Sequence, residues 1–479
     1  MRSVHPALFR RLLPRPFPTS DLRGAVRLVT GAVSGVADVV EGVHGAVPAP
    51  FGRRGRVGRV AGWAYGAVRW VTRGVGRSLD AALGAVGRGG SADGHPARDA
   101  VVAALNGAFG DSLAAQGNPL ATPFQVRYGG RRLVLDTASV ARAVADPRGV
   151  LLVQIHGLCM HDGQWGRGGV DPGAALADAL GATRVAVRYN SGRHVSESGR
   201  DLAVALDALV AAWPRRVRRL VVVGHSMGGL VARSALHYAA EAGHAWPGLD
   251  AALVTLGTPH HGAPLERLGS LVDAFLGATR YTAPLAAVGQ ARSAGVTDLR
   301  FGNVVEEDWA GRGRFDRAPD ARRPTPLPPG VACYVVAATT GDGRGGARDR
   351  TVGDGLVPLD SALGRHADPA RDLGVPPERQ WVAVGRSHLD LLSDDAVTAR
   401  LASWLARPTP PDNHPYPLLT RRGTAAAPVR PPRRLRPPRP GLSGAGWNKP
   451  GATPPTRPFS LFPFPFSLFP FPFSLFPFP

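Results

Sequence analysis

Between residues 124 and 406, short continuous apolar runs alternate with longer segments in which apolar residues recur at helical spacing. Continuous apolar runs are typical of parallel strands covered by helices on both faces, because no position of such a strand meets water. We predict strands at 149–156, 184–189, 218–223, 251–256, 331–338 and 380–384. Helices are predicted at 173–180, 196–212, 227–241 and 394–405. The alternation favours an α/β fold with a mostly parallel, doubly wound sheet.

The same pattern predicts where this domain begins and where it is interrupted. The segment QVRYGGRRLVLD, starting at Gln125, holds two short strand-like runs about a Gly-Gly turn and predicts an antiparallel hairpin. Between the strands at 251–256 and 331–338 the connection is far longer than the usual two to six residues. We therefore expect a domain over 121–406 with a cap insertion at about 262–330.

The region before this domain has a different pattern, rich in Gly, Ala and Val. Beyond a flexible N-terminus at 1–20, residues 21–120 are predicted to be helical, with helices at 22–46, 56–86 and near 97–116. In the second helix three arginines lie opposite a valine stripe, with Trp63 and Trp70 at the boundary. This basic amphipathic pattern fits a helix on an anionic membrane surface, and it equally fits a helical hairpin packed on the following domain.

The net charge of +21 first suggests a nucleic-acid binder, but its distribution changes that interpretation. Residues 1–100 and 407–479 each carry a net +9, so the middle of the chain carries only +3. The second basic segment is a low-complexity tail, Pro- and Arg-rich and ending in three copies of FSLFPFP, which we predict to be disordered. The nearly neutral middle gives no reason to expect a nucleic-acid partner.

Neither membrane nor secretory signals are evident in the pattern. No apolar stretch reaches the roughly 18 residues of a membrane-spanning helix, and the first residues lack the apolar core of a signal peptide. The two cysteines, Cys159 and Cys333, are too few for a disulfide scaffold and lack metal-ligand spacing. We therefore expect a cytoplasmic protein, at most peripherally bound to membrane, with no cofactor and no metal.

The candidate nucleophile lies where an apolar strand runs into a helix. The segment VVVGHSMGG, residues 221–229, contains G-x-S-x-G in the strand-turn-helix context of a nucleophile elbow. Gly224 and Gly228 allow the close backbone approach of that turn, and Ser226 would project above the sheet. The context predicts Ser226 as the nucleophile.

A serine nucleophile needs a base and an orienting acid, which follow it in the order acid, then histidine, in this fold. His388 comes just after the last predicted strand, at the edge where Ser226 is expected, whereas His366 lies in a polar connection. We predict His388 as the base. The candidate acids all follow the strand at 331–338: Asp342, Asp349, Asp354 and Asp360. Asp342 is nearest the strand end, and Asp354 lies in a compact GDGLVP turn.

The oxyanion of an acyl-transfer intermediate needs two backbone N–H donors. Met227, the residue after the nucleophile, is one candidate, and Leu158, in the loop after the strand at 149–156, is the other. Five further residues lie beside these positions and are candidates to line the pocket: His156, Cys159, His225, His260 and His261. The two last follow another strand end, and a plain turn role explains them as well.

Together these elements resemble the serine α/β-hydrolases, and within them bacterial true lipases and the lipase-like domain of GPI inositol-deacylases. The resemblance covers 124–406 and depends on motifs in matching order: HGL at 156–158, GHSMGGLVAR at 224–233, LGTPHHG at 256–262, DGLV at 354–357 and HLD at 388–390. It implies the triad Ser226, Asp354 and His388, favouring Asp354 over Asp342, and the oxyanion donors Leu158 and Met227.

This resemblance implies an α/β-hydrolase fold and a lipase or esterase that cleaves carboxylic esters of a lipid or other ester substrate through an acyl-enzyme. Some bacterial lipases of this group bind calcium through an acid like Asp390, but the sequence offers no second ligand. The alternative function is a membrane-associated adaptor or scaffold, in which the basic helices and tail bind partners and the hydrolase domain is catalytically silent.

Overall fold

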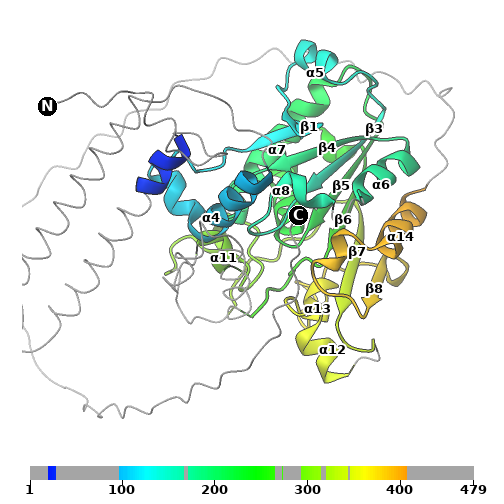
Figure 1. Cartoon of the computed structure of the whole chain (residues 1–479). Helices are drawn as coiled ribbons and strands as arrows, with labels where there is room; N and C mark the ends of the chain where they lie inside the picture. Colours follow the sequence, from blue (N-terminus) through cyan, green and yellow to red (C-terminus); the bar gives the residue numbers. More distant parts are fainter. Residues whose placement is uncertain are drawn as a thin grey trace, which may run out of the picture. The chain divides into compact units, whose positions relative to one another are not determined.

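The computed structural model describes residues 20–27, 96–166, 171–264, 272, 293–313, 320–343 and 346–406. An eight-stranded sheet runs through the described chain in the order β2-β1-β4-β3-β5-β6-β7-β8 (Figure 1). Its strands are β1 (Gln125–Tyr128), β2 (Arg131–Arg132), β3 (Val150–Ile155), β4 (Thr183–Arg188), β5 (Arg219–His225), β6 (Asp250–Leu256), β7 (Ala332–Thr339) and β8 (Gln380–Val384). Each predicted strand is present, within two residues of its predicted bounds.

The sheet is mostly parallel, and only its first edge runs the other way. β1 pairs antiparallel with β2 and with β4, which is the predicted hairpin about Gly129 and Gly130. The remaining neighbours, from β4 to β8, pair in parallel. Such a mixed, mostly parallel sheet with crossover helices is the α/β architecture predicted from the pattern, and it agrees with the α/β-hydrolase fold that the resemblance implies.

The described helices are α4 (Pro96–Ala115), α5 (Thr137–Ala143), α6 (Pro172–Leu180), α7 (Val195–Ala212), α8 (Met227–Glu241), α11 (Ala294–Asp298), α12 (Ala347–Val352), α13 (Leu359–Ala362) and α14 (Asp395–Leu405). Short 3₁₀ turns lie at η1 (Asp162–Trp165), η2 (Trp246–Gly248), η3 (Glu306–Asp308), η4 (Pro377–Arg379) and η5 (Asp390–Leu392). The five helices predicted near 97–116 and within 121–406 are all found. The short ones between them have too few residues for helical periodicity to reveal.

Two hydrophobic layers form the core, one on each face of the sheet. Leu151, Val153 and Ile155 of β3 face the layer that includes side chains of α4, α7 and α8. Leu152, between them, faces the layer that includes side chains of α6 and α14. Helices α6 and α14 lie next to each other (Figure 1). Successive side chains of a strand point to opposite faces, so a strand buried on both faces must be apolar at every position.

The register of the parallel strands brings four strand ends to one edge. Ile155 of β3 pairs with Gly224 of β5, His225 pairs with Leu256 of β6, and Leu256 pairs with Val336 of β7. The loops that leave these strands carry the predicted chemistry. Residues separated by more than 200 positions in the chain therefore meet above the carboxyl ends of the strands.

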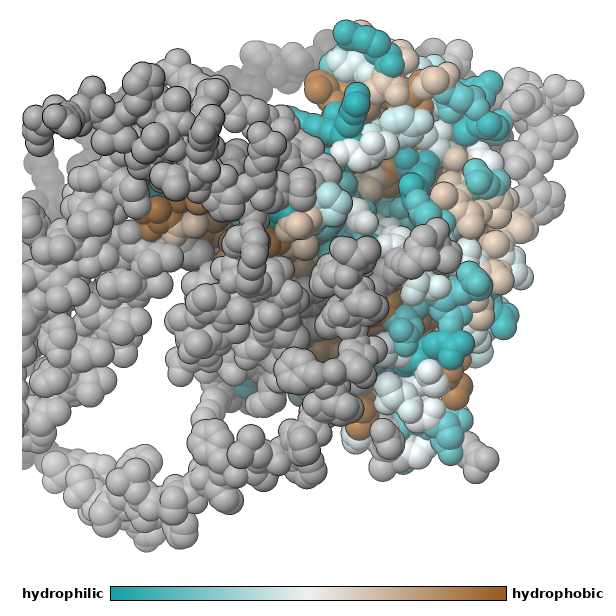
Figure 2. Space-filling model, in the orientation of Figure 1, coloured by the Kyte–Doolittle hydropathy of each residue, from teal (hydrophilic) through white to brown (hydrophobic). Residues whose placement is uncertain are grey.

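The visible face of the described domain carries polar and apolar residues side by side. Figure 2 shows hydrophilic residues spread over much of the coloured face, with apolar residues between them. Among the described residues, the exposed large apolar side chains are Val134, Val204 and Val384, which lie singly along the sequence. No helix in the described part of the chain is long and apolar enough to cross a membrane.

Several predictions fall on segments outside the described residues. The predicted helix at 22–46 is described only over 20–27, which is helical, and the helix at 56–86 and the tail at 407–479 lie outside. Contacts within the chain divide it into residues 1–409 and 410–479. The membrane-surface role of the basic helices, the disordered tail and the finer domain boundaries stay predictions.

Candidate active site

Ser226 lies at the turn between β5 and α8, in a backbone conformation that few residues adopt. Its φ is 54° and its ψ is −124°, and Cys159 is the other described non-glycine residue with positive φ. Such a conformation persists only where the surroundings enforce it. The Ser226 N–H donates to the carbonyl of Leu256 at 2.8 Å, which ties the turn to the end of β6. Ser226 is buried, with 4% of its surface exposed.

Glycines allow the backbone segments around this turn to meet. A Cβ at Gly224 would lie 2.5 Å from the backbone nitrogen of Gly229, and one at Gly228 would lie 2.3 Å from the carbonyl oxygen of Ile155. Both distances are shorter than any side chain tolerates, so G-x-S-x-G is required here by packing. A Cβ at Gly157 would lie 3.0 Å from the Cβ of Ser226, so the loop after β3 packs directly on the serine.

His388 and Asp354 form a buried, hydrogen-bonded pair. The His388 Nδ1 is 2.7 Å from Asp354 Oδ2, and the His388 backbone N–H donates to the Asp354 carbonyl at 3.0 Å. Asp354 Oδ1 accepts from the backbone N–H groups of Leu356 and Val357, at 2.9 and 2.8 Å. Every oxygen of this carboxylate therefore has a donor, and His388 is held by both its ring and its backbone.

The pair lies beside the serine turn. Gly257, directly after Leu256, has φ +58°, and a Cβ on it would lie 3.0 Å from His388 Nδ1 and 3.1 Å from Asp354 Oδ2. His388 Nε2 is buried and has no hydrogen-bond partner among the described residues. The base candidate thus keeps one nitrogen available on the side away from its acid.

The other acid candidates lie in different surroundings. Asp342 and Asp360 are exposed, and the buried Asp349 accepts a hydrogen bond from the hydroxyl of Thr339 at 2.7 Å. His366 is only partly buried and its ring lies 4.8 Å from that of His261. The structure therefore joins His388 with Asp354 and with none of these.

His225, one of the pocket candidates, contacts His388 through a hydrogen bond and a ring contact. Its Nε2 is 3.1 Å from the carbonyl oxygen of His388, and the two rings lie 4.8 Å apart at a tilt of 49°. A carbonyl only accepts, so His225 Nε2 carries the proton in this contact. His225, the residue before the serine, thus holds the backbone of His388 in place.

The loop after β3 carries the predicted oxyanion donor Leu158. The Gly157 carbonyl accepts from Met160 N–H at 3.3 Å and from His156 Nδ1 at 2.9 Å. In a trans peptide the C=O and the following N–H point in opposite directions, so these bonds also orient the N–H of Leu158. The N–H groups of Leu158 and Met227 donate to no acceptor within the described part of the chain.

His156 is a fixed, neutral part of this loop. It is fully buried and stacked on Tyr189 with ring centroids 4.4 Å apart, and its Nε2 accepts from the Tyr189 N–H at 3.3 Å. Its Nδ1 therefore carries the single proton and donates it to Gly157. Burial lowers the pKa of His156 to about 4, which keeps the ring neutral at physiological pH.

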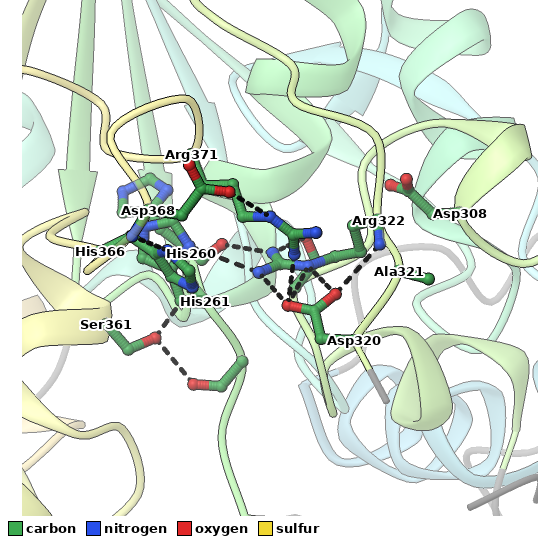
Figure 3. Close-up of polar contacts among 12 residues, drawn as sticks. His260, His261, Asp308, Asp320, Ala321, Arg322, Ser361, His366, Asp368 and Arg371 are labelled. Atoms are coloured by element: carbon green, nitrogen blue, oxygen red, sulfur yellow. Dashed lines mark hydrogen bonds and ion pairs between the residues drawn. The ribbon is translucent and has the colours of Figure 1, made fainter. Parts of the chain in front are cut away.

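His260 and His261, the other two histidines of the pocket hypothesis, belong to a separate polar cluster (Figure 3). His260 is fully buried, with Nε2 at 3.2 Å from the Thr255 hydroxyl and Nδ1 at 3.4 Å from a guanidinium nitrogen of Arg233. Burial, and then the charge of Arg233, lower its pKa well below the usual value. Both ring nitrogens of His260 are thus engaged.

Arg322 is the centre of this cluster and comes from the end of the insertion. It makes hydrogen bonds to both oxygens of Asp320, with its Nη2 at 2.9 Å, and its Nη1 donates to the carbonyls of His260 and Gly302 (Figure 3). Arg371 pairs with the same Asp320 at 2.8 Å. Burial alone would raise the pKa of Asp320, but the hydrogen bonds and charge of Arg322 lower it to about 2.

Sequence reasoning missed this cluster except for its histidines. Arg233 follows the apolar residues Leu230, Val231 and Ala232 within the GHSMGGLVAR motif, a sequence signal that could have indicated a buried cation. In the structure it is buried in α8. Its Nη2 donates to the carbonyl of Thr325 at 3.0 Å, and burial lowers its pKa to about 10. Asp320 and Arg322 lie in a segment without periodicity, so no sequence signal indicated them.

The acidic run at 306–308 has partners within the protein. Glu306 pairs with Arg200, Glu307 pairs with Arg323, and Asp308 accepts from the backbone N–H of Val304. Among the described residues no group of three or more His, Cys, Asp or Glu side chains could hold a metal ion.

The fold, and the edge of the sheet at which the loops after β3, β5, β6 and β7 meet, define the class of protein as α/β-hydrolase-like. A comparison of sequences agrees. Residues 190–310 match the family model described as the PGAP1-like alpha/beta domain, which spans β5, the serine turn and α8. This match confirms the resemblance predicted from the motifs. No curated protein is significantly similar to the chain.

Solved structures with a similar fold include three bacterial or archaeal proteins. A lipase from Bacillus licheniformis, BlEst2 in its mature form, is 20% identical, covering 55% of this chain and 95% of its own, with a TM-score of 0.36. The Pyrococcus furiosus esterase Pf2001 is 14% identical over 54% of this chain and 80% of its own, with a TM-score of 0.32. Phospholipase PlaB from Legionella pneumophila is 16% identical over 44% of this chain and 45% of its own, with a TM-score of 0.30.

Proposed function

We propose that the protein is a serine hydrolase that cleaves carboxylic esters through an acyl-enzyme, as a lipase or esterase. Ser226 is the nucleophile, His388 the general base and Asp354 the orienting acid. The observation that carries this proposal is the His388–Asp354 pair, bonded at 2.7 Å beside a strained serine, with His388 Nε2 left without a partner among the described residues.

In the first step, Ser226 Oγ attacks the ester carbonyl while His388 Nε2 takes its proton. Asp354 holds the Nδ1–H of His388, so Nε2 is the nitrogen that presents a lone pair. The imidazolium then returns the proton to the leaving alcohol. Water repeats the sequence to release the acid and regenerate the serine.

The negative charge of the tetrahedral intermediate is stabilised by the N–H groups of Leu158 and Met227. Both belong to backbone that is fixed before substrate arrives, one by the bonds to the Gly157 carbonyl and the other by the start of α8. Preorganised donors of this kind stabilise the developing oxyanion at no cost of reorganisation. Met227 also lies at the positive end of the α8 dipole.

We propose further that the insertion selects the acyl group. Its described part packs against the residue after the serine, since a Cβ on Gly295 of α11 would lie 3.0 Å from the Cε of the buried Met227 side chain. Longer acyl chains would extend along this side. A series of p-nitrophenyl esters of increasing chain length measures that selection directly.

The test compares ester hydrolysis by the wild type, Ser226→Ala and Ser234→Ala. Ser234 is a matched control because it is a fully buried serine on the same helix, α8. We expect Ser226→Ala to lose at least about a thousandfold in kcat and its labelling by a fluorophosphonate, whereas Ser234→Ala keeps both. Equal hydrolysis by the wild type and Ser226→Ala would overturn the proposal.

A further inference from the structure

Helix α4 precedes the sheet in the chain, yet it contacts the loop that carries Leu158. At the point of contact the helix has Gly107, and a Cβ there would lie 2.2 Å from Cys159 Sγ and 2.9 Å from both the Cα and the backbone nitrogen of Cys159. No side chain fits between the helix and the loop. The backbone of α4 therefore serves as the surface on which Cys159 rests.

Cys159 needs such a support because its own backbone is strained. Its φ is 60°, a left-handed conformation that is unfavourable for a residue with a Cβ. It is the third residue of the turn that the Met160 N–H closes onto the Gly157 carbonyl, so a change in its backbone angles would break this bond, which orients the peptide that carries the Leu158 N–H. Burial also raises the pKa of the Cys159 thiol, which leaves it a neutral packing group.

The loop after β4 forms the second side of the same contact. Asn190 Nδ2 donates to the Gly110 carbonyl of α4 at 2.8 Å, and a Cβ on Gly110 would lie 1.8 Å from Asn190 Oδ1. The next residue, Ser191, accepts the backbone N–H of Cys159 on its hydroxyl at 3.1 Å. Gly107 and Gly110, one helical turn apart, thus fix both the loop and the serine that holds it.

The insertion forms the third side. The Ser293 hydroxyl donates to the Gly107 carbonyl at 2.6 Å, and the Ala294 N–H donates to Asp111 Oδ2 of α4 at 3.1 Å. These bonds place α11, which also contacts the Met227 side chain through Gly295. Both proposed oxyanion donors are therefore adjacent to elements that α4 holds.

The N-terminal turn of α4 secures the far end of the same loop. Asp99, buried in α4, pairs with Arg188 at 2.8 Å, and Arg188 also pairs with Asp162 at the start of η1. Asp162 comes three residues after Cys159. The loop is thus tied to α4 by packing at Cys159 and by ion pairs just beyond it.

We propose that α4 is a positioning element of the active site, which sets the Leu158 oxyanion donor through the contact of Gly107 with Cys159. This inference rests on the proposed ester hydrolysis for its catalytic consequence. Its structural part, that α4 holds the conformation of residues 157–161, is independent of that activity and can be measured separately.

The experiment uses the full chain and the variants Gly107→Ala, Cys159→Gly, the double variant and Ala114→Ser. Alanine normally stabilises a helix relative to glycine, so Gly107→Ala should not unfold α4. Its methyl group displaces Cys159, and we expect kcat to fall at least about tenfold with KM changed less than about threefold, because the lost contact is to the transition state. Ala114 is an exposed residue of the same helix, and Ala114→Ser should match the wild type.

Rescue separates positioning from general destabilisation. Cys159→Gly adopts a positive φ without strain but loses the Sγ that packs on Gly107, so we expect it alone to lower kcat by less than Gly107→Ala does. In the double variant the 2.2 Å contact with Sγ is gone and only the two 2.9 Å backbone contacts remain, so we expect kcat to lie above that of Gly107→Ala, a coupling that independent sites would not show. A kcat in Gly107→Ala equal to that of the wild type would overturn the inference.

Amide hydrogen exchange distinguishes this failure from a failure of the proposed function. We expect faster exchange of residues 157–161 in Gly107→Ala, with unchanged exchange of β7 and β8, the two strands at the far edge of the sheet. If the wild type has no Ser226-dependent hydrolysis, the proposed function fails while this exchange result still decides the role of α4. Unchanged exchange at 157–161 would overturn the support by α4 whatever the activity.

Discussion

Two polar clusters contact the loop after β6, and the histidines at their centres, His388 and His260, differ in how completely their ring nitrogens are bonded. In one, His388 is bonded to Asp354 through Nδ1, and its Nε2 has no partner among the described residues. In the other, His260 engages both ring nitrogens, and Arg322 donates from all three of its nitrogens. Its bonds make His260 a structural residue. His261 also has a buried Nε2 without a partner among the described residues, but its Nδ1 faces the Arg322 guanidinium, a donor, so its Nε2 carries the proton. Asp354 instead accepts from Nδ1 of His388, which leaves the lone pair of Nε2 available for chemistry.

The comparison also separates histidines that the sequence leaves alike. His260 and His261 follow a strand end next to the serine turn, as a pocket residue would, and the sequence does not distinguish them from His388. Their pKa values are lowered by burial and by the neighbouring Arg233 and Arg322. A neutral histidine fixed between a hydroxyl and a guanidinium is suited to structure, and the following predictions test this division.

The largest expected effect is on activity, in the cluster of His388 and Asp354. Asp354→Asn retains an oxygen for the Leu356 and Val357 N–H groups but replaces the acceptor of His388 Nδ1–H by a donor. The imidazole then loses the orientation and tautomer that catalysis needs, and we expect kcat to fall by roughly a thousandfold or more. Ester hydrolysis with thermal unfolding measures this.

Asp342→Asn is the matched control, since Asp342 is the exposed alternative acid. It should leave kcat within about twofold of wild type. An equal loss in both variants would assign the acid wrongly and remove the basis of the comparison.

The next effect is on stability, in the cluster around Arg322. Asp320→Ala leaves the Arg322 guanidinium, 7% exposed, without its carboxylate. Breaking a buried pair from one side costs about 3 kcal/mol, so the free energy of unfolding should fall by about that amount. Urea denaturation measures it. If kcat of the folded protein falls as far as in Asp354→Asn, the cluster is catalytic and the contrast between the two is wrong.

A smaller effect is expected from pH. Burial lowers the pKa values of His156, His161 and His261 to about 4, while an unfolded chain binds these protons below about 6.5. The unfolded state therefore holds more protons in this window, and the free energy of unfolding should decrease as the pH falls from about 6.5 to about 4. Denaturant midpoints at several pH values measure the slope. His261→Asn, with one such group fewer, should give a shallower slope, and an identical slope would contradict this assignment.

The smallest effect is expected at the outer edge of the cluster around Arg322. Arg323 and Glu307 form an ion pair at 3.2 Å, and both side chains are 55% exposed. Solvent-exposed pairs contribute little, so Arg323→Ala should change the free energy of unfolding by less than about 0.5 kcal/mol. A loss as large as that of Asp320→Ala would mean that burial does not distinguish the two pairs.

Much of the fold could be predicted because its signals are local. A buried strand such as VLLVQI in β3 is recognised from its own residues, and so is the glycine pattern around Ser226. The short helices α11, α12 and α13 were not predicted, because four to six residues are too few for periodicity. Asp320 and Arg322 were missed because their partners are distant in sequence.

The sequence by itself determined the order of strands and helices, the serine turn and the small set of acids and histidines from which a triad could be drawn. Apolar periodicity and the steric need for glycine act over a few residues, so they can be recognised without knowing the neighbours. Only the tertiary structure decided which acid meets His388, which histidines bond to Arg233 and Arg322, and that α4 supports Cys159 through Gly107. These outcomes depend on distances between segments far apart in the chain, which packing alone establishes.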